Sequence, residues 1–440
     1  MKCITRQRCI VWIVLVAAIA LSLFLAMFQA ACGAQISDSQ RAAIAAIMTA
    51  IEANEQFSGT ALVSVGGEIV YSGAIGFADI ERGALNALDT QFRIASATKP
   101  FTTLLIYQLV ASGKLTLNDK LSDLVPEYPA DKGANITVSH LLNHTSGITG
   151  EWRIDELADI ERNRWTQDGL LAEVAGRDLV FAPGTGEEYS NYGYFLLGVI
   201  IERVGGASYA DQLRDRICTP AGMTHTRGDE NDAIIPGRAL GYNFDYLLGP
   251  QHAPYLDMSF VFGYGHLLST VSDLNRFAAA LDDPAVLPVE YRDMFFSECG
   301  WTVQCIPVGN GSRRVCGNYL CGSINGFASH IFRVEKDEIF IALLKNMKEP
   351  GAQIAVKWPD FIASRVLAVL YDEPFDMPSK SAAFAVFEAL RDQGVEAGRQ
   401  RYADLVNAQN PDYYVDAEEF RRLAEVIPAL WDIAPLIGES

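Results

Sequence analysis

The sequence lacks a surplus of positive charge. Its 440 residues include 35 lysines and arginines against 54 aspartates and glutamates, which gives a formal net charge of −19. A protein that binds nucleic acid needs a basic face, so this balance argues against a nucleic-acid partner. The charge favours solubility and says little about fold. Because 50% of the residues are hydrophobic, the chain can bury one large core and carry an appendage.

Long apolar runs are absent from the sequence except near its start. Lys2, Arg6 and Arg8 precede an apolar run over residues 10–28 that only Ser22 interrupts, and small residues follow it. This order is typical of an export signal cleaved after Ala34, so we expect a periplasmic, secreted or membrane-anchored protein. The run is also long enough to span a bilayer. An uncleaved signal anchor, which would tether the protein to a membrane, and lipidation at a nearby cysteine therefore stay open.

Paired C-x-x-C spacings, which a zinc site of cysteines would need, are absent as well. The chain has 8 cysteines, and four of them cluster in one short segment: Cys299, Cys305, Cys316 and Cys321. In an oxidising compartment this cluster predicts two local disulfides. Three pairings are open, and the sequence does not choose among them. Cys218 lies outside the cluster and is expected to be a buried thiol.

Strand patterns lie at both ends of the chain, with helical patterns between them. A helix is predicted over 38–53, followed by a hairpin over 60–71 that turns at a glycine pair. From about 115 to 265 we expect helical segments and loops rich in glycine and proline. Strand character returns at 322–332 and 338–344. Strands from distant segments imply an antiparallel sheet with an inserted helical region, which is an α+β fold.

The pattern changes again near the C-terminus. Apolar residues at helical spacing over 384–405 predict a helical hairpin, and Asp416 is expected to begin a further helix. We therefore divide the chain into a signal segment, a main domain and a C-terminal helical extension, which cover residues 1–34, 35–375 and 376–440.

The segment Ser96-Ala97-Thr98-Lys99 is the first that indicates chemistry. A serine hydroxyl is a poor nucleophile until a base takes its proton. Residues three apart share one face of a helix, so Lys99 is placed beside the Ser96 hydroxyl. Pro100 fits only if the helix begins close to Ser96, and the serine then lies at the positive end of the helix. An ordinary helix start gives the same pattern, so this motif alone does not decide the function.

A second segment, Tyr189-Ser190-Asn191, follows a Pro- and Gly-rich loop and precedes an apolar helix. In an extended segment Tyr189 and Asn191 point the same way. A neighbouring lysine ammonium would favour the phenolate, so we expect the pKa of Tyr189 to fall below its usual value and Tyr189 to serve as a base. A half-buried loop tyrosine and a turn asparagine are the structural alternative.

With these two motifs in place, the sequence resembles the serine beta-lactamase and penicillin-binding-protein superfamily. The likeness is nearer to class C beta-lactamases, D-alanyl-D-alanine carboxypeptidases and related esterases, and it covers about residues 55 to 350. Several ordered matches are more specific than one. Besides the two motifs, the matching segments are Ile136–Ile148, Pro220–Met223, Gly265–Leu274 and Gly322–Phe327.

The resemblance implies a beta-lactamase/transpeptidase-like fold and assigns roles to residues. Ser96 would be the acylated nucleophile, and Lys99 and Tyr189 would share the proton transfers. The backbone N–H groups of Ser96 and Ser323 would form the oxyanion hole. The substrate would be a small-molecule or peptide ester or amide, with no cofactor and no metal. The residues expected to bind it are Asn191, Gly322 and Ser323.

The third motif of the family is altered in this chain. The family has Lys or His, then a small residue, then Gly, whereas this chain has Leu320-Cys321-Gly322. Leucine cannot hold a substrate carboxylate or tune the proton network. This weakens the two specific hypotheses, beta-lactamase and D-alanyl-D-alanine carboxypeptidase, and leaves hydrolysis of an ester or amide as the expected reaction. A non-catalytic binding or sensing module that retains the fold is the alternative from another class.

Other polar residues are interpreted as structural. His140 and His144 have the spacing of two zinc ligands on a helix, but the glutamate of the metalloprotease motif is missing. Thr270 with Asp273 is typical of a helix cap. Arg93 is expected to form an ion pair.

Overall fold

The structure is a computed structural model that describes most of the chain after the N-terminal segment. Residues 1–34, the predicted signal, lie outside the described part. None of the helices in the described part is long and apolar enough to cross a membrane. The described ranges are 36–54, 57–150, 161–245, 248–297, 301–309, 311–348, 357–407, 413–415 and 420–421.

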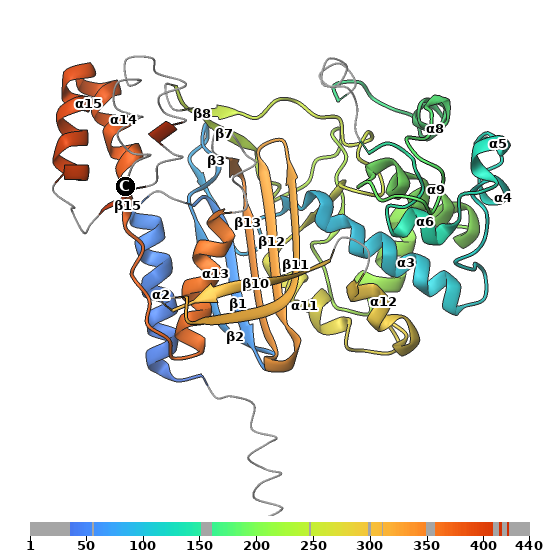
Figure 1. The fold of residues 1–440 in the computed structure, drawn as a ribbon, viewed down its shortest axis with the longest axis horizontal. Helices are drawn as coiled ribbons and strands as arrows, with labels where there is room; N and C mark the ends of the chain where they lie inside the picture. Colours follow the sequence, from blue (N-terminus) through green and yellow to red (C-terminus); the bar gives the residue numbers. More distant parts are fainter. Residues whose placement is uncertain are drawn as a thin grey trace, which may run out of the picture.

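A six-stranded antiparallel sheet forms the centre of the molecule (Figure 1). Its strand order is β10-β11-β12-β13-β1-β2, so strands from both ends of the domain lie side by side. β1 pairs with β13 from Gly59 opposite Lys345 to Val65 opposite Ile339. The strands are β1 Gly59–Val65, β2 Glu68–Ile75, β10 Thr302–Val308, β11 Arg313–Ile324, β12 Phe327–Val334 and β13 Ile339–Lys345.

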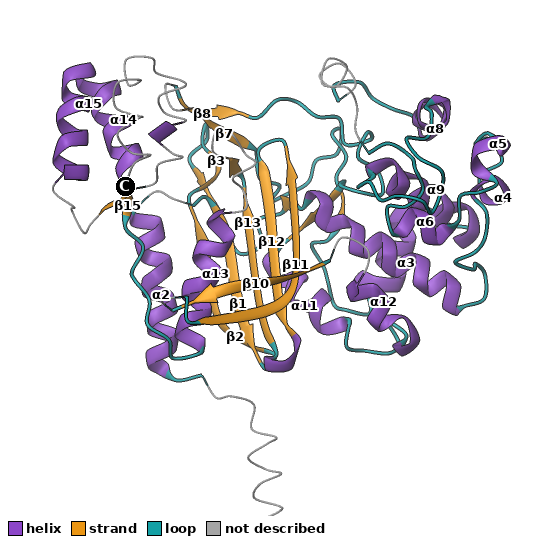
Figure 2. Ribbon diagram, in the orientation of Figure 1, coloured by secondary structure: helices purple, strands orange, loops and turns teal. Residues whose placement is uncertain are grey.

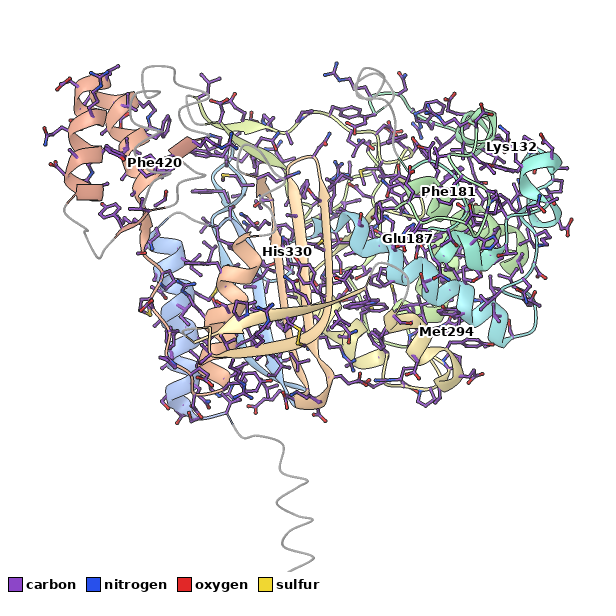
Figure 3. The ribbon with its side chains drawn as sticks, viewed as in Figure 1. Lys132, Phe181, Glu187, Met294, His330 and Phe420 are labelled. Atoms are coloured by element: carbon purple, nitrogen blue, oxygen red, sulfur yellow. A yellow bond between two sulfur atoms is a disulfide. The ribbon has the colours of Figure 1, made fainter. Side chains whose placement is uncertain are left out.

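Helices cover both faces of this sheet (Figure 2). On one face α2 (Asp38–Ala53) and α13 (Lys357–Leu370) pack on Val63, Ile341 and their neighbours. Leu62 and Ala342, one position along the same strands, belong to the larger core on the other face. This alternation follows from the two-residue period of a strand. Side chains fill the layers on both faces (Figure 3).

The inserted region between β4 and β10 consists of helices and loops, as expected, and it also holds short strands. Two of its helices, α3 and α9, pack against each other in the larger core. The helices are α3 Lys99–Ala111, α4 Leu121–Leu124, α5 Ala130–Gly133, α6 Val138–Leu142, α8 Gln167–Gly176, α9 Asn191–Gly205, α10 Tyr209–Leu213, α11 Val271–Ala280 and α12 Arg292–Ser297.

Small sheets join this region to the central sheet. One has the order β5-β9-β6, and another has the order β14-β7-β8. β14 follows directly after β13 in the chain, so it lies at the end of the central sheet. The short strands are β3 Phe77–Asp79, β4 Ala84–Leu85, β5 Phe92–Arg93, β6 Arg227–Gly228, β7 Tyr242–Asp245, β8 Gly249–His252, β9 Leu267–Ser269 and β14 Met347–Lys348.

The C-terminal part contains a helical pair, α14 (Ala382–Gln393) and α15 (Val395–Tyr402). These helices have a hydrophobic cluster of their own, which includes Phe387 and Leu405. The cluster is joined to the rest of the chain by Phe384, whose ring centroid lies 5.4 Å from that of Phe244. The strand β15 (Lys380–Ser381) pairs with β16 (Tyr413–Tyr414). The helix expected to begin at Asp416 falls outside the described residues, and the proposed domain boundaries stay a prediction.

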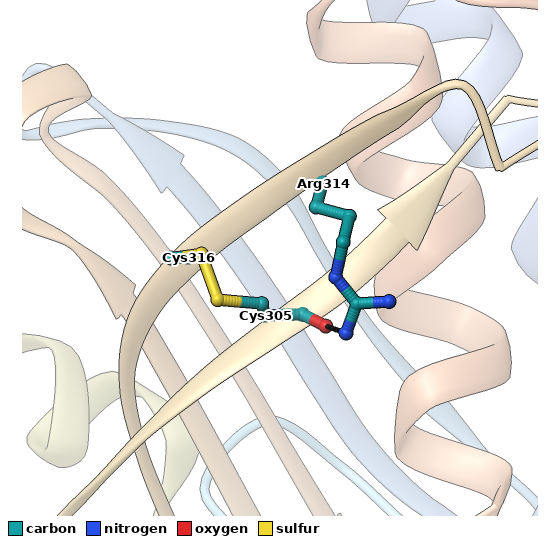
Figure 4. The surroundings of a disulfide bond; sticks show 3 residues. All are labelled: Cys305, Arg314 and Cys316. Carbon is teal, nitrogen blue, oxygen red and sulfur yellow. Dashed lines mark hydrogen bonds between the residues drawn. A yellow bond between two sulfur atoms is a disulfide. The ribbon is translucent and has the colours of Figure 1, made fainter.

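One of the expected disulfides is present, between Cys305 and Cys316 (Figure 4). The two cysteines face each other across β10 and β11, and Arg314 donates a hydrogen bond to the Cys305 carbonyl at 2.7 Å. Cys299 lies outside the described residues. Cys218 is a buried free thiol, as predicted, and burial raises its pKa to about 12.

Candidate active site

Ser96 lies in a short 3-10 turn, Ala95–Thr98, that leads directly into α3. Ala95 has a positive φ of 51°, a strained conformation for a residue with a side chain. Two contacts hold this turn in place. Thr98 Oγ1 accepts a hydrogen bond from the Leu267 N–H at 3.3 Å, and Ser329 Oγ donates to the Ile94 carbonyl at 2.7 Å. The candidate nucleophile is therefore fixed by both the small sheet and β12.

Lys99 is completely buried beside Ser96. Its Nζ donates hydrogen bonds to Ser96 Oγ at 3.2 Å and to Asn191 Oδ1 at 2.9 Å, and it lies 3.4 Å from the Tyr264 carbonyl oxygen. Removal from water disfavours the ammonium form, and this burial lowers the pKa of Lys99 to about 7. A large fraction of Lys99 is therefore neutral near neutral pH and able to accept a proton.

Tyr189 reaches Ser96 from the other side. Its hydroxyl donates a hydrogen bond to Ser96 Oγ at 2.9 Å. The residue as a whole is 48% exposed. The pKa, by contrast, is set by the surroundings of the hydroxyl, which points inward.

The sequence-based expectation for the pKa of Tyr189 is wrong in direction. Burial of the hydroxyl raises the pKa to about 12, and the hydrogen bond with Ser96 only partly opposes that rise. Lys99 Nζ lies 4.6 Å from the centroid of the Tyr189 ring, but with its own pKa of about 7 this amine has lost its charge at the alkaline pH where a tyrosine titrates. Tyr189 is therefore a protonated hydrogen-bond donor.

The imidazole ring of His144 supports Tyr189 by two contacts. Its Nδ1 accepts the Ser190 N–H at 3.0 Å, and its ring centroid lies 4.7 Å from that of Tyr189. Burial lowers the pKa of His144 to about 4, so it is neutral here. His140 instead accepts the Thr137 N–H at the start of α6. The two histidines thus bind different backbone groups, and in the described ranges no set of three His, Cys, Asp or Glu side chains could hold a metal ion.

Ser190 places Tyr189 and Asn191 at the start of α9. The Ser190 side chain caps the helix by accepting the Gly193 N–H at 3.1 Å. Asn191, the first helical residue, is then directed at Lys99. Ser190 itself has an extended backbone, with φ −123° and ψ 112°, so Tyr189 and Asn191 face one centre as expected, at the point where an extended residue leads into α9.

Gly322 lies where β11 approaches Ser96 most closely. A Cβ atom at this position would come 2.3 Å from the Ile94 carbonyl oxygen and 2.8 Å from the Ser96 nitrogen. No other residue type fits there without moving the strand. β10 pairs with β11 as far as Tyr319, so the following residues, which include Gly322 and Ser323, turn that edge of β11 toward Ser96.

The structure thus brings Ser96, Lys99, Tyr189 and Asn191 into one hydrogen-bonded group, with Gly322 against it. Ser323 is the next residue on β11 and is exposed. Its hydroxyl accepts a hydrogen bond from Lys348 Nζ at 2.8 Å. The sequence analysis missed Lys348 and Tyr264, because neither belongs to a motif and both reach the site through the fold.

The remaining structural interpretations hold. Arg93 forms an ion pair with Asp229 at 2.7 Å. Thr270 accepts the Asp273 N–H at 3.1 Å and caps α11. Leu320 of the altered third motif is buried in the larger core.

Comparisons with known proteins show the family and the fold to which the chain is similar. A model of the Beta-lactamase family matches residues 44–356. Penicillin-binding protein 4* of Bacillus subtilis (strain 168) is 31% identical over 360 residues, which cover 74% of this chain and 75% of that protein. The crystal structure of a D-amino acid amidase from Ochrobactrum anthropi SV3, complexed with L-phenylalanine amide, is 25% identical with a TM-score of 0.63, over 75% of this chain and 99% of that chain. A class C beta-lactamase structure shares the fold at 22% identity and a TM-score of 0.61, over 78% of this chain and 99% of that chain.

Proposed function

Because the chain belongs to the Beta-lactamase family and is a hydrolase of that fold, we propose that it cleaves an ester or amide bond through a covalent acyl-enzyme on Ser96. The observation that carries the proposal is the position of the Ser96 hydroxyl between two other side chains. It lies 3.2 Å from a buried amine and 2.9 Å from a protonated phenol. A nucleophile between a base and a proton donor is the arrangement that acyl transfer requires.

In the acylation step, neutral Lys99 takes the proton of Ser96. The Ser96 oxygen forms a bond to the carbonyl carbon of the substrate, and the π electrons move to the carbonyl oxygen. The N–H groups of Ser96 and Ser323 would hold this oxyanion. No backbone acceptor occupies the Ser96 N–H among the described residues, as expected for the first turn of a helix. Each such donor contributes about 3 kcal/mol to lowering the barrier.

In the second half of acylation, Tyr189 donates its proton to the leaving alcohol or amine as the bond to carbon breaks. The proton on Lys99 then restores the hydroxyl of Tyr189. This role as an acid replaces the role as a base that the sequence suggested, because a pKa of about 12 keeps the phenol protonated. Deacylation repeats the sequence with water in place of Ser96, and Lys99 accepts the proton of the water. Asn191 holds Lys99 in position and is proposed to contact the substrate.

The named activities stay alternatives within this proposal. A D-amino acid amidase among the similar structures supports amide cleavage. The penicillin-binding relative supports a D-alanyl-D-alanine-type peptide or a beta-lactam. Buried Leu320 in the third motif motivates the other class, a module that keeps the pocket without turnover.

We also propose that the protein is exported. The basic and apolar N-terminal sequence supports this, and so does the disulfide between Cys305 and Cys316, because disulfides persist in oxidising compartments. The mass of the mature protein from cells that express the full chain would show a loss of residues 1–34. An intact N-terminus would refute cleavage.

The test of the proposed function is steady turnover of a p-nitrophenyl ester by the wild type and by Ser96→Ala. We expect Ser96→Ala to abolish turnover and to abolish labelling by a fluorophosphonate, which phosphonylates the serine oxygen with loss of fluoride. Ser312→Ala, at an exposed serine, is the matched control and should behave as the wild type. Labelling without turnover would favour the binding module. Turnover that survives Ser96→Ala would refute the mechanism.

A further inference from the structure

His144 holds the chain on both sides of Tyr189, the proton donor of the proposed mechanism. The His144 carbonyl oxygen accepts the N–H of Glu188 at 2.9 Å. The imidazole Nδ1 of the same residue accepts the N–H of Ser190 at 3.0 Å. Both sequence neighbours of Tyr189 are therefore hydrogen-bonded to one residue, which follows α6 in a distant part of the chain.

The backbone conformation of His144 accompanies this double contact. Its φ is 58°, in the left-handed region that histidine, asparagine and aspartate adopt more often than most residues with a side chain. In this conformation the carbonyl and the ring of His144 both bind the segment that carries Tyr189. Gly150 encloses the segment further along, where a Cβ atom would come 1.8 Å from the Tyr189 carbonyl oxygen. The backbone of Tyr189 therefore has no room to shift toward Gly150.

The imidazole ring also limits the direction of the Tyr189 side chain. Its centroid lies 4.7 Å from that of the Tyr189 ring and 5.3 Å from that of the Tyr194 ring. Tyr194 is fully buried in α9, and its hydroxyl donates to the Leu142 carbonyl at 3.2 Å. The Tyr189 ring thus lies against an imidazole that the helical core holds in place.

A buried imidazole is an unfavourable way to fill this position unless its acceptor is needed. His144 is 9% exposed, and burial lowers its pKa to about 4, so the ring is neutral. Because Nδ1 accepts the Ser190 N–H, the ring proton is on Nε2. Among the described residues Nε2 has no hydrogen-bond partner, which is unfavourable for a buried donor. An apolar side chain would avoid this cost, but it would leave the Ser190 N–H without its acceptor.

We propose that His144 is a positioning residue for proton donation: it holds the Tyr189 hydroxyl at Ser96, where this hydroxyl protonates the leaving group. The inference rests on the proposed function. The hydroxyl lies 2.9 Å from Ser96 Oγ. Loss of the His144 side chain removes one of the two backbone anchors of Tyr189 and the surface against which its ring lies. The hydroxyl then moves away from the leaving group, whereas Ser96 and Lys99 are held by other contacts and stay in place.

The test compares ethyl acetate, followed by titration of the acetic acid released, with p-nitrophenyl acetate. Both esters give the same acetyl-enzyme, and kcat/KM reports its formation. Ethanol leaves only when it gains a proton, whereas p-nitrophenolate leaves without one. We expect His144→Gly, which suits the positive φ, to lower the ratio of kcat/KM for ethyl acetate to that for p-nitrophenyl acetate by about 100-fold, the cost of a misplacement of about 1 Å. Tyr189→Phe should lower the ratio at least as far.

This ratio does not depend on the folded fraction of a variant, because both values come from the same sample. A variant that is only destabilised therefore keeps the wild-type ratio. His144→Ala gives the same comparison if His144→Gly does not fold. His144→Asn places an amide oxygen where Nδ1 lies and tolerates a positive φ, so it should keep most of the ratio. The matched control is His140→Asn, since His140 Nδ1 also accepts a backbone N–H, that of Thr137 at 3.3 Å. It should keep the full ratio.

The outcomes separate the inference from the proposed function. If His144→Gly lowers both kcat/KM values equally, or if His144→Asn loses as much of the ratio as His144→Gly, the inference is overturned while the Ser96-dependent hydrolysis stands. A wild type that cleaves only p-nitrophenyl acetate overturns it too, because there is then no proton donation for His144 to support. If the wild type cleaves neither ester and neither labels Ser96, the proposed function has failed, and the inference falls with it.

Discussion

Replacement of Gly322 by alanine tests how closely β11 must approach the nucleophile. The new Cβ would lie 2.3 Å from the Ile94 carbonyl oxygen and 2.7 Å from Ser329 Oγ. Carbon and oxygen atoms that are not bonded rarely come nearer than about 3 Å to each other. The Ile94 carbonyl belongs to the backbone and cannot rotate away, so the edge of β11 must move outward by roughly 1 Å.

This movement carries the N–H of Ser323 away from the oxyanion. A misplacement of about 1 Å costs about 100-fold in rate, and loss of one oxyanion donor costs about 100- to 1,000-fold. We therefore expect Gly322→Ala to lower kcat/KM for a p-nitrophenyl ester by about 100-fold. The free energy of unfolding should fall by about 1–3 kcal/mol, the usual cost of overpacking, so the variant should remain folded.

Gly176→Ala is the control for this experiment. Gly176 ends α8, and a Cβ there would meet nothing within 4 Å. Its activity should equal that of the wild type. If Gly322→Ala is folded by circular dichroism and keeps kcat/KM within about twofold, the close approach of β11 to Ser96 has no catalytic role and the assignment of the oxyanion hole is wrong.

Two further predictions concern proton transfer and stability. Because burial lowers the pKa of Lys99 to about 7, its amine loses the proton as pH rises through that value, and kcat/KM should rise to a plateau above about pH 8; a pH–rate profile that is flat between pH 5 and 9 would contradict Lys99 as the base. Loss of the disulfide between Cys305 and Cys316, whose sequence separation is 11, should lower the free energy of unfolding by about 2–3 kcal/mol in the Cys305→Ser, Cys316→Ser double variant. Denaturation with guanidinium chloride measures this loss, and an unchanged midpoint would mean that β10 and β11 need no covalent link.

The sequence predicted those parts of the fold whose signals are local. The helix over 38–53 matches α2 residue for residue, because a capping serine and an apolar period mark it. The hairpin over 60–71 is also confirmed, since Gly66 and Gly67 both have the positive φ that its turn requires. The α+β fold class is confirmed. The strand expected over 322–332, however, is two strands.

The turn between β11 and β12 was missed although it contains an Asn-Gly pair. Asn325 and Gly326 separate two apolar runs, and Ile324 pairs with Phe327 across the turn. The apolar character on both sides hid this signal. Likewise, the sequence left three disulfide pairings open, and the strand register that places Cys305 opposite Cys316 comes from pairing over a distance.

In the candidate site, too, local contacts were predicted from the sequence and contacts between distant segments were not. Lys99 follows Ser96 by one helical turn, so local geometry brought them together correctly. The pKa of Tyr189 is raised rather than lowered, because burial of its hydroxyl outweighs the influence of Lys99, an amine that is neutral at the alkaline pH where a tyrosine titrates. Motif analysis could not predict the contact of Lys348 with Ser323, because the two residues are 25 positions apart and the contact depends on β14.

The pairing of β1 with β13 also limits when the central sheet can form during synthesis. Gly59 and its neighbours hydrogen-bond with residues up to Lys345, so the nascent chain cannot close its central sheet until nearly the whole domain has left the ribosome. Contacts so distant in sequence make folding slow. Until β13 has been made, β1 lacks its partner strand and the central sheet stays incomplete.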